Sequence, residues 1–279
     1  MKVLSTIADF KQARRKISTS LGFVPTMGYL HEGHLSLVRL ARAENEMVAV
    51  SIFVNPTQFG PTEDLAKYPR DTERDLGLLR KEGVDLVFMP SPEDMYPEGF
   101  STWVDVEKVT DRLEGEFRPG HFRGVATVVA KLFNTVEPTR AYFGQKDAQQ
   151  AVMIKKMVAD LDMNLEVVVA PTVREPDGLA MSSRNVYLNP KERQAALVLW
   201  KSLNLARELW SKGERDANNI RHQMVFLIRK EPLADIGYVS IADPDTLEEL
   251  SRIDRSALVS MAVRIGKTRL IDNITLGGD

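Results

Sequence analysis

Short runs of apolar, β-branched residues alternate with amphipathic segments through the first two thirds of this chain. Residues 47–54 are almost all apolar, which is typical of a strand buried on both faces, and residues 84–89 repeat the pattern. Residues 71–81 lie between them, with leucines spaced among charged residues as in a surface helix. This alternation predicts an α/β fold with a Rossmann-like, doubly wound parallel sheet, whose ligands bind at the carboxyl ends of the strands.

The pattern changes after about Arg184. Helical segments come first there and strand-like runs follow, which predicts a smaller α+β domain. No low-complexity linker marks the change, so the predicted domains are residues 1–184 and 185–279. The elements expected from residue 125 onward are helices over residues 125–136, 145–160, 190–212 and 217–230 and strands over residues 140–143, 165–170, 237–241, 257–265 and 270–274.

The composition excludes several classes of protein. The chain of 279 residues has no cysteine, which rules out disulfides, a thiolate nucleophile and a cysteine-ligated metal and fits a reducing cytoplasm. Its formal net charge of −2 argues against a dedicated nucleic-acid binder, because such proteins usually carry a basic surplus. The N-terminal residues lack the apolar core of a signal peptide, and no run approaches about 18 apolar residues, so no membrane segment is expected.

Residues 25–34, Pro-Thr-Met-Gly-Tyr-Leu-His-Glu-Gly-His, stand between a short apolar run and an amphipathic segment. This context predicts a strand, a glycine-bearing turn and a helix, which together present backbone N–H groups and a positive helix N-terminus to one point. Gly28 and Gly33 leave room for the close approach of a nucleotide. His31 and His34 are expected on one helix face, where they reach the same ligand. The segment therefore favours a phosphate-binding site.

Each piece of this segment also has an ordinary interpretation. A His-x-x-His pair is more often a surface or core pair than an active site, and paired glycines usually serve turns. A metal site is a third interpretation, but one helix face supplies only two ligands, and no Glu or Cys cluster stands at ligand spacing. The other segments of the chain decide which of these three interpretations of residues 25–34 applies.

Two further segments place polar side chains after predicted strands. Asn55 and Gln58 carry amides that both donate and accept, which suits a substrate with hydroxyl and carboxylate groups, although the same residues suit an ordinary turn. Lys146 can neutralise a phosphate, with Asp147 as an N-cap or first-turn acid and Gln150 on the helix that follows. A solvated Lys–Asp pair is the alternative.

Residues 171–185 combine a Pro-Asp-Gly turn signal with Ser182, Ser183 and Arg184. Two hydroxyls and a guanidinium match a polyphosphate, and the turn-rich flanks suit a mobile loop that closes on phosphates. The same Ser-Ser-Arg sequence also suits a helix N-cap. Residues 118–125 are glycine-rich and basic, and they either line a substrate pocket or only cap the helix that follows.

With these segments in this order, the sequence resembles the pantoate–β-alanine ligase family, which belongs to the HxGH nucleotidyltransferase superfamily. The resemblance rests on residues 24–34, 51–59, 143–150 and 173–184, and it extends over essentially the whole chain with weaker motifs toward the C-terminus. It implies that ATP and pantoate form pantoyl adenylate and pyrophosphate, after which β-alanine displaces AMP to give pantothenate.

The resemblance also implies roles for individual residues. His34 is the catalytic residue, as a proton donor and phosphate stabiliser, and His31, Lys146 and Arg184 act with it. The residues implied to bind ATP are Met27, Gly28, Tyr29, Leu30, His31, Glu32, Gly33, His34, Gly144, Gln145, Lys146, Asp147, Val173, Met181, Ser182, Ser183 and Arg184.

Pantoate is assigned in the same way to Gln58 and Gln150, and β-alanine to Gln58. Gln145 stands where the family carries Glu, so a metal-binding or lysine-pairing role is not expected there. Mg²⁺ is expected with ATP, but its protein ligand is unknown: Asp75 is a candidate, and an exposed acid on a charged helix is the alternative. The resemblance further implies a homodimer, and residues 185–279 are expected to close over the active site.

Other functions remain to be weighed. One is a nucleotidyltransferase that attaches AMP or CMP to a phosphorylated acceptor, as pantetheine-phosphate adenylyltransferases do, but Asn55, Gln58 and Gln150 favour an unphosphorylated, hydroxyl-rich acid. Another is an aminoacyl-tRNA synthetase fragment or RNA-binding relative, against which the net charge counts. A nucleotide sensor without activity is a third, and the presence of both histidines together with Lys146 and Arg184 counts against it.

Overall fold

The computed structural model describes residues 1–61 and 63–277, which form two compact units. No helix among these residues is both long enough and apolar enough to span a bilayer. Unit 1 comprises Met1–Glu107, Arg118–Gly144 and Met153–Pro171, and unit 2 comprises Lys108–Phe117, Gln145–Val152 and Thr172–Asp279.

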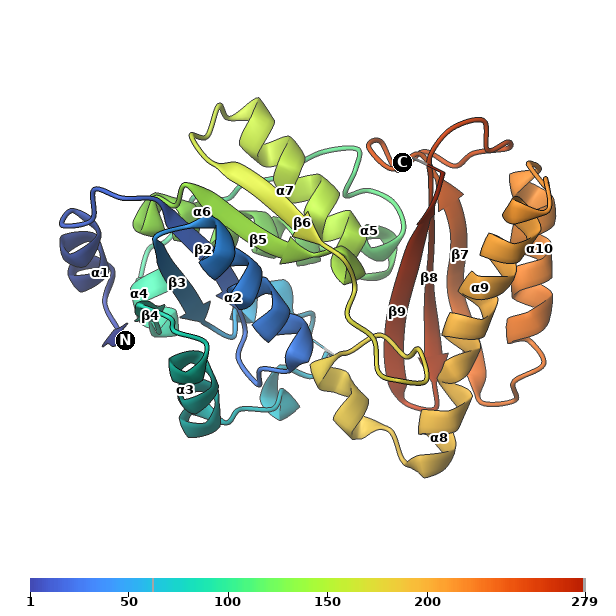
Figure 1. Cartoon of the computed structure of the whole chain (residues 1–279), viewed down its shortest axis with the longest axis horizontal. Coiled ribbons are helices and arrows are strands. Elements are labelled where there is room, and N and C mark those ends of the chain that lie inside the picture. Colours follow the sequence, from blue (N-terminus) through green and yellow to red (C-terminus); the bar gives the residue numbers. More distant parts are fainter. Residues whose placement is uncertain (62, 278–279) are drawn as a thin grey trace. The chain divides into compact units, whose positions relative to one another are not determined.

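Unit 1 is built on a six-stranded sheet in which all neighbouring strands are parallel. In the order in which they lie side by side (Figure 1), the strands are β1 (Lys2–Leu4), β4 (Leu86–Phe88), β3 (Met47–Ile52), β2 (Leu21–Thr26), β5 (Arg140–Gly144) and β6 (Glu166–Ala170). The chain passes from β2 through β3 to β4, and β5 then lies on the other side of β2. This confirms the predicted doubly wound sheet and places its reversal of strand order between β2 and β5, where such sheets bind ligands.

Helices cover both faces of this sheet: α2 (Glu32–Glu44) and α3 (Thr72–Lys81) cover one, and α1 (Ile7–Arg14) and α6 (His121–Val136) cover the other. Successive strand residues point to opposite faces. Val87 therefore packs in the apolar core beneath α2 and α3, whereas its neighbour Phe88 lies with its ring centroid 5.0 Å from that of Phe10. Phe143 meets Phe133 of α6 in the same way at 6.3 Å.

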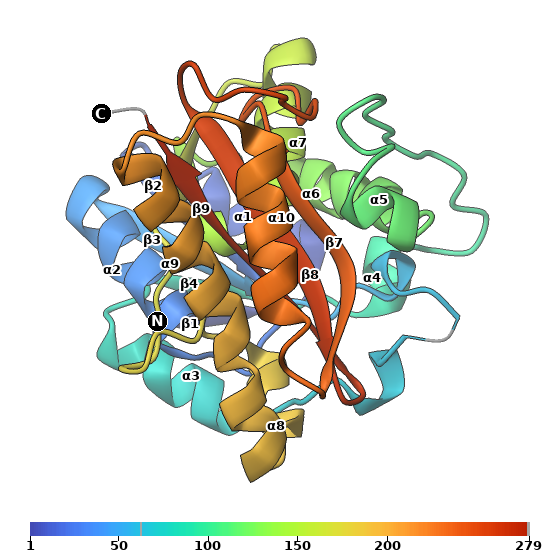
Figure 2. The same ribbon diagram turned by 90° about the vertical axis from the view of Figure 1, so that its right-hand side faces the viewer.

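Unit 2 contains an antiparallel sheet of β7 (Ala234–Ala242), β8 (Ala257–Ile265) and β9 (Thr268–Leu276). Figure 2 shows α9 (Leu197–Ser211) and α10 (Ala217–Ile228) side by side across one face of this sheet, and their apolar residues share one core with it. Helices precede strands, as predicted for an α+β arrangement. The shorter helices of unit 2 are α5 (Glu114–Phe117), η3 (Gln145–Asp147), η4 (Ser183–Tyr187) and α8 (Pro190–Ala195).

Several element boundaries differ from those expected. The helix expected to begin at residue 125 begins at His121, because Gly120 adopts a left-handed conformation (φ +80°) and serves as its N-cap. The helix expected over residues 145–160 is η3 followed by α7 (Ala148–Asp160), and its first residues group with unit 2. The chain crosses between the units several times and enters unit 2 for the last time after Pro171. The domain boundary after Arg184 remains a prediction.

Candidate active site

The histidine-bearing turn connects the carboxyl end of β2 to α2. Gly28 (φ +81°) and Tyr29 (φ +50°) both have left-handed backbone conformations in this turn. That conformation is strained for Tyr29. A side chain on Gly28 would stand only 3.0 Å from Ile52 Cγ2 and 3.1 Å from Asp75 Oδ2. The left-handed backbone therefore favours glycine at position 28, and the close packing leaves little room for a side chain there.

Asp75 of α3 holds this turn in place. Its side chain is buried, with 1% of the residue exposed, and Oδ2 accepts a hydrogen bond from Tyr29 N at 2.6 Å while Oδ1 accepts one from Leu30 N at 2.8 Å. The burial of Asp75 corrects the interpretation of this residue as an exposed acid, whereas no contact tests its interpretation as a metal ligand. Asp75 instead anchors the turn, with each carboxylate oxygen engaged by a backbone N–H group.

His31 and His34 cap the N-terminus of α2 reciprocally. His31 is the N-cap residue, in an extended conformation, so it stands just before the helix, whereas His34 lies in its first turn. Its Nδ1 accepts a hydrogen bond from Gly33 N at 3.1 Å, and His34 Nδ1 accepts one from His31 N at 3.3 Å. The ring centroids nevertheless lie only 4.1 Å apart. Because both Nδ1 atoms accept hydrogen bonds, the ring hydrogen lies on Nε2, an atom type that can donate to an anion.

Gln58 lies in η1 (Pro56–Gln58), just beyond β3, and both ends of its amide are held. Asn55 Nδ2 donates to Gln58 Oε1 at 3.1 Å, and Gln58 Nε2 donates to Met27 Sδ at 3.3 Å. Asn55 itself is 1% exposed, and its Oδ1 accepts a hydrogen bond from the Tyr96 hydroxyl at 2.8 Å. Of the two amides expected at this strand end, Asn55 is thus a buried support, and Gln58 is the half-buried one beside the histidine turn.

In unit 2, η3 is held by Asn273 of β9. Asn273 Nδ2 donates to the carbonyl oxygens of Gln145 and Lys146, both at 2.9 Å, and Gln145 Nε2 donates to Asn273 Oδ1 at 3.3 Å. A glutamate at position 145 could not make the last bond, so glutamine has a structural partner there. Lys146 Nζ lies 4.0 Å from Asp147 Oδ1, a loose ion pair.

The segment after Pro171 folds as a small hairpin of unit 2. Met181 N donates to Val173 O at 3.0 Å. Arg174 donates to both carboxylate oxygens of Asp272, at 2.7 and 2.9 Å, and Asp272 is 2% exposed. This bidentate pair ties the hairpin to β9.

The Ser-Ser-Arg sequence stands at the start of η4. The Ser182 hydroxyl accepts a hydrogen bond from Arg184 N at 3.2 Å, which confirms the N-cap interpretation for Ser182. Ser183 is buried and Arg184 is half-buried. Capping employs the Ser182 oxygen as an acceptor, so its hydroxyl hydrogen can still be donated to a phosphate.

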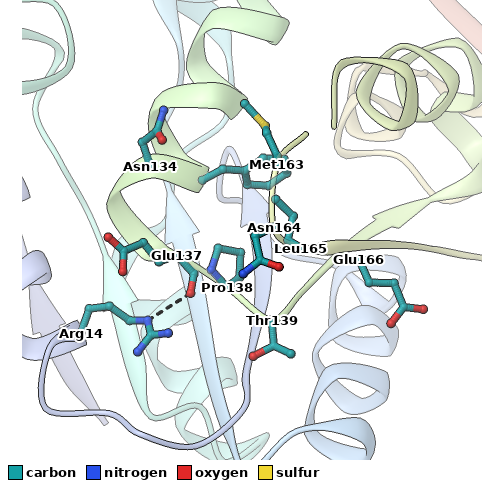
Figure 3. A pocket seen from close by; sticks show the side chains of 10 residues that line it. Arg14, Asn134, Glu137, Pro138, Thr139, Met163, Asn164, Leu165 and Glu166 are labelled. Atoms are coloured by element: carbon teal, nitrogen blue, oxygen red, sulfur yellow. Dashed lines mark hydrogen bonds between the residues drawn. The ribbon is translucent and has the colours of Figure 1, made fainter. Parts of the chain in front are cut away.

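A pocket of about 680 Å³ lies elsewhere in unit 1, at the amino ends of β5 and β6 (Figure 3). Arg14 Nε donates across its edge to the Glu137 carbonyl oxygen at 3.1 Å. The pocket is lined by Arg14, Phe133, Asn134, Glu137, Pro138, Thr139, Met163, Asn164, Leu165 and Glu166. Ligands of doubly wound sheets bind at the carboxyl ends of the strands, so this pocket is not the candidate active site.

Comparison with known proteins identifies the family. The family model for pantoate–β-alanine ligase matches residues 2–275. The chain belongs to this family. Among curated relatives, the pantothenate synthetase of Roseiflexus castenholzii is 61% identical over 276 residues, which cover 99% of each chain. That of Thermotoga petrophila is 57% identical over 280 residues, which cover 99% of this chain and 100% of the relative.

Solved structures of the family share the fold. Pantothenate synthetase from Thermus thermophilus is 51% identical with a TM-score of 0.94, and the match covers 98% of this chain and 99% of that one. A pantoate–β-alanine ligase from Francisella tularensis, in complex with β,γ-ATP and β-alanine, is 35% identical with a TM-score of 0.81, and the match covers 98% and 97%. The resemblance and the fold class predicted from the sequence are both confirmed.

The residues that the family resemblance assigns to substrates fall in both units. In unit 1, the contact between Met27 and Gln58 joins the histidine turn to the predicted pantoate residue. Unit 1 holds residues 27–34, Gln58 and Gly144, and unit 2 holds residues 145–147, Gln150, Val173 and residues 181–184.

Sequence reasoning missed the anchoring role of Asp75, although a signal existed: Asp75 stands four residues before Leu79 and so shares the apolar face of its helix.

Proposed function

We propose that this protein joins pantoate to β-alanine in an ATP-dependent reaction that yields pantothenate, AMP and pyrophosphate. The family match over residues 2–275 carries the proposal. The histidine turn supports it, because it follows β2 at the reversal of strand order. Pantothenate formation that requires ATP, pantoate and β-alanine together tests the proposal; no product with all three present would contradict it.

In the first step, a carboxylate oxygen of pantoate attacks the α-phosphorus of ATP. An O–P bond forms as the bond from that phosphorus to the bridging oxygen of pyrophosphate breaks, so negative charge builds on the α-phosphate and on the leaving group. His34 and His31 suit these oxygens, because both rings carry Nε2–H at the N-terminus of α2, where an anion is favoured. We assign His34 the central role, as phosphate stabiliser and proton donor.

The other ATP contacts are assigned to segments that present donors or positive charge. Lys146 and Arg184 supply cations for the phosphates, and Ser182 and Ser183 supply hydroxyls. The remaining assigned residues are those of residues 27–34, with Gly144, Gln145, Asp147, Val173 and Met181.

In the second step, the β-alanine amine attacks the carbonyl carbon of the adenylate, and AMP leaves as the amide forms. The amine loses a proton in this step, which passes to the departing AMP phosphate or to water. Gln58 is assigned to both pantoate and β-alanine, and Gln150 to pantoate. The fixed amide of Gln58 supports this assignment, since its two ends are already oriented by Asn55 and Met27.

Replacing Gln58 with alanine is expected to raise the KM for pantoate about tenfold, as the loss of a substrate hydrogen bond implies, with little change in the KM for ATP. Steady-state kinetics with each substrate varied in turn measures both constants. Gln12→Ala, on the exposed surface of α1, is the matched control. An unchanged KM for pantoate would remove Gln58 from the substrate site.

We also propose that Mg²⁺ accompanies ATP and neutralises charge on its pyrophosphate oxygens. Among the residues that the structure describes, no group of three or more His, Asp or Glu side chains is placed to hold a metal ion. Magnesium in such reactions usually keeps several waters and binds through substrate phosphates, so it needs no such group. Full activity in excess EDTA would contradict the proposal.

A homodimer is proposed from the family resemblance. β6 is an edge strand of the unit 1 sheet, and its central residues, three valines, are only partly buried. An apolar edge of this kind is a typical pairing surface. A solution mass of a single chain would contradict the proposal. The cytoplasm as location and closure of residues 185–279 over the active site are proposed on the resemblance alone.

A further inference from the structure

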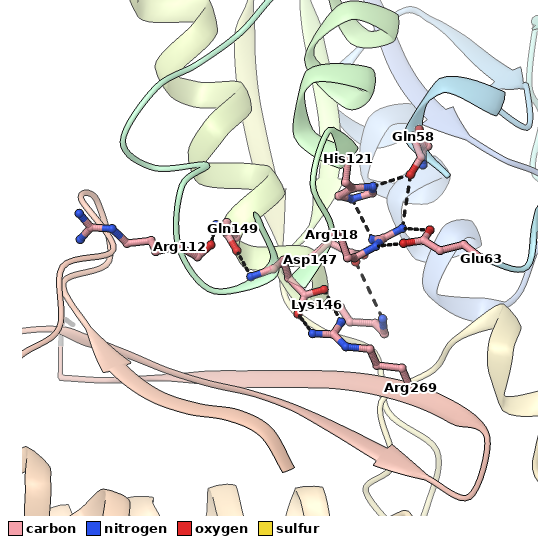
Figure 4. A network of polar contacts seen from close by, with 10 residues as sticks. Gln58, Glu63, Arg112, Arg118, His121, Lys146, Asp147, Gln149 and Arg269 are labelled. Atoms are coloured by element: carbon pink, nitrogen blue, oxygen red, sulfur yellow. Dashed lines mark hydrogen bonds and ion pairs between the residues drawn. The ribbon is translucent and has the colours of Figure 1, made fainter. Parts of the chain in front are cut away.

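A chain of four polar groups in unit 1 ends at the backbone of Gln58. Glu63 and Arg118 form a bidentate ion pair, in which Arg118 Nε donates to Oε1 at 2.8 Å and Nη2 donates to Oε2 at 2.7 Å. Arg118 Nη1 lies 2.9 Å from His121 Nε2, and His121 Nδ1 lies 2.8 Å from the Gln58 carbonyl oxygen. Figure 4 shows Arg118 between Glu63 and His121, with the His121 ring directed at Gln58.

The direction of each hydrogen bond follows from the groups at the two ends. A guanidinium only donates, and a carbonyl oxygen only accepts. His121 must therefore accept from Arg118 on Nε2 and donate to the Gln58 carbonyl from Nδ1. These contacts favour the Nδ1–H tautomer of His121, which is the opposite of the tautomer favoured in His31 and His34.

Arg118 is itself fixed by Glu63. The two side chains are 18% and 24% exposed. Burial opposes ionisation of Glu63, but the hydrogen bond from Arg118 and its positive charge outweigh burial, so the pKa of Glu63 lies below its usual value. The carboxylate is therefore ionised at neutral pH, and the bidentate geometry sets the plane of the guanidinium that faces His121.

The turn that carries Gln58 also rests directly on α6. A Cβ atom at Gly124 would stand 2.4 Å from Thr57 O and 2.8 Å from Gln58 N, so only glycine permits this approach. His121 and Gly124 are three residues apart and share one face of the helix. One helix face thus sets both the closeness of the turn and the direction of the Gln58 carbonyl.

We propose that His121 is a positioning residue of the ligase reaction, which fixes the Gln58 backbone and thereby aims the Gln58 amide at its substrates. Arg118 and Glu63 hold the His121 tautomer that this requires. The inference rests on the substrate role of Gln58 in the proposed function. His121 holds the carbonyl at 2.8 Å, Arg118 Nη2 adds only a long contact to the same oxygen at 3.5 Å, and Asn55 holds the side chain. Losing the short bond from His121 therefore lets the amide turn away from the substrate. Binding of pantoate is then weakened, and binding of ATP is not.

Two variants distinguish the contribution of His121 Nδ1 from that of His121 Nε2. Asparagine places its amide nitrogen at the position of Nδ1 and still donates to Gln58, whereas glutamine places its amide near the position of Nε2 and does not. His121→Gln and His121→Ala are expected to raise the KM for pantoate about fivefold to tenfold, with the KM for ATP within about twofold of the parent. His121→Asn is expected to stay within about twofold of the parent in both constants.

The control is His222→Gln, an exposed histidine of α10. A His121→Asn variant no better than His121→Gln would overturn the positioning role, as would an equal rise in both Michaelis constants. If the His121 variants fail to fold, Glu63→Gln weakens the same chain of contacts. It is expected to raise the KM for pantoate about threefold, and an unchanged value would overturn the proposal.

The Gln58→Ala variant distinguishes this inference from the proposed function. A raised KM for pantoate in Gln58→Ala with an unchanged value in His121→Gln overturns the positioning role alone. Unchanged values in both variants overturn the substrate role of Gln58, and the positioning role with it.

Discussion

Replacing His34 with alanine or asparagine is expected to lower the kcat of pantothenate formation by about 100-fold or more, as the loss of a transition-state donor implies. Both variants lose the Nε2–H group that we assign to charge forming at the α-phosphate. Asparagine keeps an acceptor at the position of Nδ1, and it can therefore still receive the bond that His31 N makes at 3.3 Å. The asparagine variant thus separates catalysis from capping of α2.

Steady-state rates at saturating substrates measure this effect, with His222→Asn as the control. A kcat within about threefold of the parent in His34→Ala would remove His34 from catalysis. Activity retained in His34→Asn but lost in His34→Ala would show that capping is its main role.

Replacing Asp75 with alanine is expected to lower the free energy of unfolding by about 2–4 kcal/mol, because one buried and one partly buried N–H group lose their acceptor. The same change releases the strained backbone of Tyr29 and so should also lower kcat. Asp75→Asn should lie between the parent and the alanine variant, since its amide offers one acceptor and sets an N–H donor against the other backbone N–H group.

Denaturant unfolding of each variant, together with its kcat, measures both effects. Asp160→Ala removes an exposed carboxylate from the same unit and should change stability by no more than about 0.5 kcal/mol. If Asp75→Ala costs less than about 1 kcal/mol, the two hydrogen bonds do not anchor the turn.

The strands and helices whose apolar residues recur at regular spacing could be predicted from the sequence. Apolar runs such as residues 47–54 report burial on both faces, and burial on both faces is characteristic of parallel sheets. The glycine-bearing turn after β2 was likewise predictable, because Gly28 and the helix that follows are local features. The family resemblance then supplied the candidate role of His34, which composition and spacing alone left open.

Contacts between residues distant in the sequence could not be predicted. Asp75 lies 45 residues from Leu30, and Asn273 lies 128 residues from Gln145, so neither partner is visible in a local pattern. The grouping of residues 145–152 with unit 2 has the same origin, since η3 is held by β9 rather than by its neighbours along the chain. A pattern records whether a residue is buried, but it does not name the partner that buries it.

Exchange of labelled pyrophosphate into ATP, measured with Mg²⁺ and without β-alanine, tests the central claim most directly. If the protein forms pantoyl adenylate reversibly, exchange will appear when pantoate is added and will be absent without it. No exchange with pantoate would contradict the adenylate route, and exchange that responds instead to a phosphorylated acceptor would indicate a nucleotidyltransferase.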